Sequence, residues 1–369
     1  MQMQSYKAEH ADAVIAMNQR LKEGGSSWGF YDSETPRWIP KTHASQKAWT
    51  EYHLAIDDQQ EVHGGYVIKY QTITFKSEEL TVSSWQGPVS EGLVNNRYAA
   101  LGFLMIRDIM EKNENLFLWG GSDKLIELID RMQWPNRYLP FHLYVVKPFN
   151  FLTKANILRN SKIKALVCDF AAYSGVGALA IKLWQKIRHK NTNARSVDVI
   201  AVDTFDDWAT TLWHAAKHQY QFTGVRDKEH LNLFHFSGDW PNSKILRVKK
   251  EGHDLGWVAV KFTQFEDDHR FGAMRVATLV DMVALPEKEH LIMQVVLSHL
   301  KKLGDVDLVC TCLSNGTWQH SVKNCGYTLV PNRRCFALAP ALAAQIDDFD
   351  DFISQTHLTL IDSDGPHGF

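Results

Sequence analysis

In the first 150 residues, segments whose apolar residues recur with the period of a helix follow segments that have the period of a strand. Over residues 6–21 the apolar positions lie near one face, which predicts a helix; they are Ala11, Val14, Ile15, Met17 and Leu21. Other apolar runs predict strands at 52–56, 65–74, 80–85, 116–119 and 138–146, and helices at 96–112 and 123–132. Together they predict an N-terminal α/β module over residues 1–150.

The same order of elements begins again after a mostly helical bridge at residues 151–195. Strands are expected at 256–262, 278–285, 307–313 and 329–338, and helices at 205–219, 288–303 and 317–324. The segment from Ser122 to Trp134 has a counterpart from Asn315 to Tyr327 with the same internal spacing. Two diverged copies of one module explain this order, so we expect a second module at 196–345 and an acidic tail at 346–369.

The most informative segment joins the strand that ends near Ser90 to the helix that follows it. A helix that starts after small residues presents free N–H groups and the positive end of its dipole, which attract a diphosphate. Ala99, Ala100 and Gly102 would let a ligand approach the main chain, and Arg97 adds a positive charge. Pro88 removes a backbone donor, so neighbouring strands can separate there and pair with an amide-bearing ligand arm. The alternative is an ordinary helix start without a ligand.

Composition excludes several classes of protein. The chain has 369 residues, 45% of them hydrophobic, and a net charge of −2, so a nucleic acid is not expected as its main partner. Five cysteines and an N-terminus without a basic and apolar leader favour a reducing cytoplasm. The most apolar stretch, 165–184, is interrupted by charges and glycines, which argues against a membrane-spanning segment. Because lysines flank it, it could lie on a membrane surface, but we expect a buried helix between the modules.

Two spacings that suggest a metal have simpler explanations. Cys310 and Cys312 lie in an apolar run, where strand alternation puts both thiols on one face. His214 and His218 are one helical turn apart, but no nearby acid completes a ligand set, so a surface helix is expected. We therefore predict no metal site.

These motifs resemble those of tandem GNAT-type acyl-CoA N-acyltransferases, of the bacterial type associated with envelope and polysaccharide assembly. The diphosphate motif of that family, Arg/Gln-x-x-Gly-x-Gly/Ala, is matched by Arg97 to Gly102, with Ala100 in place of the first glycine. The later pair Gly-Phe is matched by Gly326-Tyr327 and more loosely by Gln133-Trp134. The resemblance implies an α/β (α+β) fold of two GNAT-like modules, each a mixed, mostly antiparallel twisted sheet flanked by helices. It implies that acetyl-CoA or another acyl-CoA binds the first module, at Pro88, Val89, Arg97, Tyr98, Ala99, Ala100, Leu101 and Gly102.

The chain departs from the family pattern at two places. The family often uses a tyrosine as general acid where Ile129 and Val322 stand here, so that role is unfilled or filled from elsewhere. In the second module the place of the phosphate turn has no glycine, and Glu289 there would repel phosphate. We consider two catalytic carboxylates: Glu91, near the expected thioester, and Asp281, an acid inside an apolar strand. The alternatives are a solvated loop acid for Glu91 and a hydrogen-bonded structural acid for Asp281.

The resemblance thus implies transfer of an acetyl or other acyl group from coenzyme A to a small-molecule amine, and by analogy an amino sugar. Two alternatives stay open. One is a tRNA-dependent aminoacyl transferase of the peptidoglycan type, which would need a basic surface for tRNA. The other is a degenerate GNAT-like protein that binds a ligand without catalysis. The C-terminal Asp362-Ser363-Asp364 also resembles an ending of such chains, and its acids could fold back onto a site.

Overall fold

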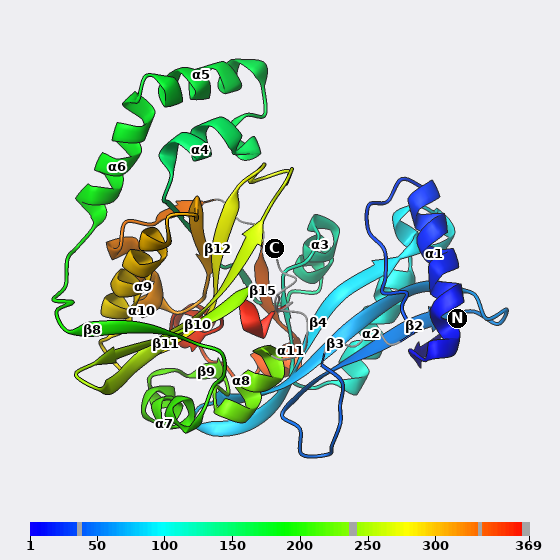
Figure 1. The fold of residues 1–369 in the computed structure, drawn as a ribbon. Coiled ribbons are helices and arrows are strands. Elements are labelled where there is room, and N and C mark those ends of the chain that lie inside the picture. The colour runs from blue at the N-terminus through cyan, green and yellow to red at the C-terminus, as the bar shows by residue number, and fades with distance from the viewer. Residues whose placement is uncertain (35–38, 236–241, 331–333, 364–369) are drawn as a thin grey trace. The chain divides into compact units, whose positions relative to one another are not determined.

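A computed structural model describes residues 1–34, 39–235, 242–330 and 334–363 (Figure 1). The chain divides into two compact units. Unit 1 contains Met1–Tyr138 and Arg333–Phe349, and unit 2 contains Leu139–Asn332 and Asp350–Phe369.

Unit 1 is built on a mixed sheet with the strand order β1-β2-β3-β4-β5-β15-β6. The β4–β5 pair is parallel, and the other pairs in this order are antiparallel. Helix α1 packs on one face through Val14, Met17 and Leu21, while α2 and α3 pack on the other face. The bounds are β1 Gln2–Ser5, α1 Ala11–Glu23, β2 Ala48–Ile56, β3 Val62–Phe75, β4 Glu78–Ser90, α2 Leu101–Lys112, β5 Leu116–Trp119, α3 Asp123–Arg131, β6 Asn136–Tyr138, β15 Cys335–Leu338 and α11 Pro340–Ala343.

Unit 2 repeats this plan on a sheet with the order β14-β7-β13-β12-β11-β10-β8, in which β12 and β13 are the parallel pair. Helices α7 and α9 pack on the sheet, and α10 packs beside α9. The bounds are β7 Phe141–Val145, α4 Pro148–Lys154, α5 Lys162–Tyr173, α6 Val176–Arg188, β8 Val197–Val202, α7 Asp207–Ala216, β9 Phe222–Gly224, α8 Lys228–His235, β10 Ser243–Lys250, β11 His253–Gln264, β12 Arg275–Ala284, α9 Glu289–Leu303, β13 Leu308–Cys312, α10 Gly316–Asn324, β14 Thr328–Val330, α12 Phe349–Gln355 and β16 Thr356–His357.

Two mixed sheets flanked by helices confirm the predicted fold class. The predicted repeat is visible in local detail: Ser122 caps α3 and Asn315 caps α10. At matching places after these helices, Gln133 and Gly326 both have a positive φ, of 58° and 87°. Each helix therefore ends in the same left-handed turn, in which the carbonyls of Ile129 and Val322 accept from the backbone N–H groups of Trp134 and Tyr327.

The last strand expected in each module lies elsewhere in the structure. β7, expected to complete the first module, pairs with β13 in unit 2, and β15 pairs with β5 in unit 1. The expected single strand at 329–338 is in fact β14 and β15, which belong to different sheets. An apolar run predicts a strand but not its partner, so the pattern could not place this exchange.

The helical bridge forms α4, α5 and α6, which pack against one another within unit 2 (Figure 1). The expectation of a buried helix at 165–184 is wrong, because Leu166, Phe170, Leu179 and Leu183 are more than half exposed. Within the described residues no single helix is long and apolar enough to cross a bilayer. By length and composition, α5 and α6 reach that threshold only as a pair, which is bent by 79°.

Candidate functional site

The parallel strands β4 and β5 separate at the place where the sequence predicted it. Their ladder runs from Ser83↔Leu116 to Trp85↔Leu118, whereas β4 continues along β3 as far as Ser90↔Gly64. Between these points Gly87 has a φ of 51°, and the β3–β4 register shifts between Gly65 and Val67. This bulge lies on β4 at Gly87 and Pro88, just beyond the end of the ladder with β5.

The connection from β4 to α2 consists of two short capped turns. The Ser90 hydroxyl accepts from the N–H of Gly92 at 3.1 Å, and the Asn95 side chain accepts from the N–H of Arg97 at 3.0 Å. A Cβ on Gly92 would lie 2.6 Å from the carbonyl oxygen of Tyr98, so only glycine fits there. The backbone ahead of α2 is therefore fixed by its own hydrogen bonds.

Glu91 holds this connection in place through buried contacts to α1 and β3. It is buried, forms an ion pair with Arg20 of α1, and its Oε2 lies 2.8 Å from Nδ1 of His63. Arg20 also donates to the carbonyl of Val62 at 2.6 Å. The prediction of Glu91 as a catalytic base stays untested, but both of its oxygens are already engaged by positive or donor groups. These contacts favour an anchoring role over the solvated loop acid considered as the alternative.

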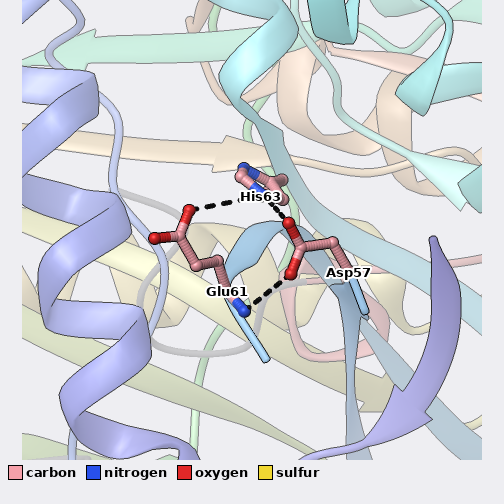
Figure 2. A group of neighbouring side chains, drawn as sticks. All are labelled: Asp57, Glu61 and His63. Carbon is pink, nitrogen blue, oxygen red and sulfur yellow. Dashed lines mark hydrogen bonds and ion pairs between the residues drawn. The ribbon is translucent and has the colours of Figure 1, made fainter. Parts of the chain in front are cut away.

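His63 continues the network to the surface (Figure 2). Its Nε2 lies 3.1 Å from Asp57 and 3.9 Å from Glu61, and its ring stacks on Tyr98 with 4.2 Å between centroids. The N–H of Glu61 donates to Asp57, and this bond is the largest cause that lowers the pKa of the Asp57 carboxyl. Ligand atoms of Asp57, Glu61 and His63 lie within 4.8 Å of one another, a spacing that could hold a metal ion. The hydrogen bonds already account for this arrangement.

The start of α2 is open at the residues where a ligand was predicted. Arg97, Ala99 and Ala100 are exposed, and Ala100, at the N-cap, has no side chain that can cap the helix. A Cβ built on Gly102 meets no atom within 4 Å. The Cβ position of Gly102 therefore faces open space in the first turn of α2, where a ligand could approach the helix start.

An apolar groove of about 750 Å³ runs from this helix start along α2. Its size is within the range of small-molecule sites. Arg107, one turn beyond Phe103, is mostly exposed and forms an ion pair with Glu111 at 3.6 Å beside the groove. The groove is lined by Ala100, Phe103, Leu104, Ile106, Arg107, Met110, Glu111 and Met132.

The corresponding strands of unit 2 also separate, because the β12–β13 ladder ends at Thr278↔Cys310. Here the C-terminal segment of the chain lies at the end of β13. Leu313 bridges to Thr359, and Ser314 hydrogen-bonds to Thr356 and Leu358. In unit 2 the chain's own C-terminal segment therefore lies where the two parallel strands separate.

Asp281 is fully buried. It belongs to an ion cluster with Arg226 and with Asp362 of the C-terminal segment. Its Oδ1 is 3.2 Å from Nη2 of Arg226 and accepts from the hydroxyl of Thr359 at 2.8 Å. The same Nη2 contacts Asp362 at 2.5 Å. Burial raises the pKa of Asp281, and the Arg226 charge opposes this shift. The catalytic prediction for Asp281 stays untested, and the contacts favour the structural acid considered as its alternative.

The structure thus brings the predicted binding residues, from Pro88 to Gly102, together around one corner of unit 1. Ile129 and Val322, at the places of the family's acid, are both fully buried. Asp362 does fold back, onto Arg226, while Asp364 lies outside the described residues. Sequence reasoning missed Arg20 and His63, which are distant from Glu91 along the chain. It also missed Arg107, whose spacing from Phe103 could have indicated it.

Comparisons with known proteins identify the fold. No family profile matches the chain, and no curated protein sequence matches it. Among solved structures, a tandem GNAT protein from the clavulanic acid biosynthesis pathway has a TM-score of 0.51 at 10% identity, over 92% of this chain and 98% of that one. N-myristoyltransferase of Saccharomyces cerevisiae, solved with myristoyl-CoA, has a TM-score of 0.50 at 9% identity, over 91% and 78%. An Enterococcus faecalis protein described as a probable N-acyltransferase has a TM-score of 0.50 at 8% identity, over 92% and 72%. The chain therefore has the fold of tandem GNAT proteins.

Proposed function

We propose that this chain is an acyl-CoA-dependent N-acyltransferase that binds acyl-CoA in unit 1. The observation that carries the proposal is the open corner, where the start of α2 adjoins the separated edge of β4. Two of the structural neighbours support it, because one was solved with bound myristoyl-CoA and the other is a tandem GNAT protein. The fold alone would not suffice, since one fold hosts many functions.

The corner would hold the diphosphate of coenzyme A. The N–H groups at Leu101 and Gly102 would donate to its oxygens, and Arg97 would add charge. The groove along α2 would take the nucleotide end, with Phe103 and Met110 as apolar contacts and Arg107 near its phosphate. Apart from Arg97, which lies in the turn ahead of the helix, these contacts come from α2, so a single rigid element positions most of the site.

The pantetheine arm would then lie along the edge of β4 beyond Trp85, pairing its amides with the strand beyond the end of the ladder with β5. The acceptor amine, as a free base, attacks the thioester carbonyl. A C–N bond forms, the C–S bond breaks and coenzyme A leaves as the thiolate. The proton lost by the nitrogen passes through water to the sulfur, which gives the thiol. Holding the two reactants together supplies much of the rate. We assign Glu91 to positioning the loop rather than to taking this proton.

The finer assignments are also proposals. We propose acetyl-CoA as the donor and an amino sugar as the acceptor, both from the resemblance in the motifs. The envelope and polysaccharide subtype and a cytoplasmic location belong to the same proposal. The cysteines support the location, because all five are free thiols.

A coupled assay of thiol release tests the activity. The protein is mixed with acetyl-CoA and a panel of amines that includes glucosamine and its phosphates, and free coenzyme A is measured. We expect release that depends on the amine, and loss of this release in Gly102→Glu. The matched control is Gly316→Glu, which alters a first-turn helix glycine in unit 2 where a Cβ meets only Ser354, at 3.5 Å. Amine-independent release, or equal rates in all three proteins, would contradict the proposal.

A degenerate binding protein is the second candidate, and the burial of Ile129 and Val322 favours it. Neither side chain can donate a proton, so the family's usual acid is missing in both units. Binding of acetyl-CoA without transfer to any amine in the panel would support this candidate. Transfer to even one amine would exclude it.

A further inference from the structure

Helices α5 and α6 present their large apolar side chains outward. On α5, Ile163, Leu166, Val167 and Phe170 are between 62% and 76% exposed. Their spacing puts them on one stripe of the helix. Such a stripe normally faces a protein core, so its exposure here requires an explanation.

The stripe continues on α6, where Leu179, Leu183, Trp184 and Ile187 are between 50% and 72% exposed. Small and polar residues of α6 instead face the rest of unit 2. Gln185 is buried and donates to the carbonyl of Val145 at 3.1 Å. A Cβ on Gly177 would lie 2.7 Å from Leu152, so this glycine lets α6 pack closely. α6 therefore turns its small and polar side chains toward unit 2 and its large apolar side chains outward. A helix that packs on its own domain normally does the opposite.

The charges beside the stripe are nearly all positive. Lys162 and Lys164 on α5, and Lys182, Lys186 and Arg188 on α6, are exposed. The helical period places them along the sides of the apolar stripe. The one acid in these two helices, Asp169, is held by two bonds from Arg159, at 2.6 and 3.0 Å. This positive border contrasts with the net charge of −2 for the whole chain.

We propose that α5 and α6 together form a docking surface for an anionic lipid membrane. The apolar stripe would enter the boundary between headgroups and acyl chains, while the lysines contact lipid phosphates. The helices have 12 and 13 residues, about 18–20 Å each, so neither reaches across the ~30 Å hydrocarbon core. The 79° bend between them separates two short helices, each suited to lie in the membrane plane.

Charge also argues against a second copy of the chain as the occupant. In a two-fold symmetric pair, the same patch meets itself, so lysines would face lysines without acids to compensate. An anionic surface removes this repulsion and is attracted from a distance of about 10 Å at 0.1 M salt.

Vesicle sedimentation tests the proposal. The full chain is spun with vesicles of phosphatidylcholine and phosphatidylglycerol, and with vesicles of phosphatidylcholine alone. We expect binding to the anionic vesicles that weakens with salt. The double variant Phe170→Glu and Ile187→Glu should lower the partition coefficient about tenfold or more. Because both side chains are more than 70% exposed, its melting temperature should match that of the unaltered protein.

Two further variants test whether binding depends on the position of the apolar residues and on the lysines. Ile15→Glu, at a half-exposed site on α1, is the matched control and should bind as the unaltered protein does. Lys182→Glu with Lys186→Glu should reduce binding to anionic vesicles. Absence of binding to either vesicle, or equal binding by all variants, would overturn the proposal. So would a dimer in light scattering that Phe170→Glu and Ile187→Glu convert to a monomer, since a second copy would then cover the face.

Discussion

Replacing Arg226 by methionine would remove the centre of the buried ion cluster in unit 2. The guanidinium is 1% exposed and bonds to the carbonyl of Gly224, to Asp281 and to Asp362. Methionine fills similar space without a charge. The change therefore leaves two buried carboxylates facing each other with no cation between them.

The expected loss of stability follows from this geometry. Breaking a buried ion pair by removing one partner lowers the free energy of unfolding by about 3–5 kcal/mol. For a unit of this size, 1 kcal/mol corresponds to roughly 2–4 °C in melting temperature, so a decrease of roughly 6–20 °C is expected. One carboxyl will take up a proton rather than stay charged, so its pKa rises further. A raised pKa in the folded state means that stability falls as pH rises above about 4, so the loss should be larger at pH 8 than at pH 5.

Thermal and urea unfolding at the two pH values measures this loss. Lys228→Met is the matched control, because it removes the cation of a solvent-exposed pair with Asp207 in the same unit. That change should lower stability by about 1 kcal/mol or less. If Arg226→Met were no more harmful than the control, or if its effect did not grow with pH, the cluster would not hold the C-terminal segment in place.

Three smaller predictions follow from other contacts. Asp281→Asn should lower the melting temperature while leaving acyl transfer per folded molecule within about twofold, whereas a catalytic acid would lose far more activity. Glu91→Gln should lower the free energy of unfolding by about 1–3 kcal/mol and raise KM for acyl-CoA more than it lowers kcat; the reverse split, seen in steady-state kinetics, would make Glu91 catalytic after all. Burial lowers the pKa of His142 to about 4, so the folded state holds this ring neutral. The free energy of unfolding is therefore unaffected by its titration above pH 6.5 and decreases as pH falls from 6.5 toward 4, where the unfolded chain takes up the proton first. His142→Leu should therefore gain about 1.4 kcal/mol per pH unit over the unaltered protein in that range, and parallel pH curves in urea unfolding would refute this.

Local order was predictable from the sequence, whereas pairing over long distances was not. The strand at Leu116–Trp119 and the repeated turn after Ile129 and Val322 follow from apolar period and cap residues within a few positions. Strands β8 and β10 were not predicted. β8 is mostly apolar but follows directly on the predicted helical bridge, whereas β10 is rich in lysine and so has a weak apolar signal.

The corner and the two acids show the same contrast. The separation of β4 from β5 could be predicted because Pro88 has a local backbone effect. The surroundings of Glu91 and Asp281 could not, because their partners come from other parts of the chain: Arg20 and His63 for one, Arg226 and Asp362 for the other. No local pattern distinguishes a buried anchoring acid from a catalytic one.

A calorimetric titration with acetyl-CoA tests the central claim most directly. The open Cβ position of Gly102 on α2 in unit 1, and the chain's own segment beside the separated strands of unit 2, predict one site per chain. Gly102→Glu should abolish the heat of binding, because a carboxylate would stand where the diphosphate lies, while its melting temperature stays unchanged since a Cβ there meets no atom within 4 Å. Absence of binding to the unaltered protein, or equal affinity in a folded Gly102→Glu variant, would contradict the account.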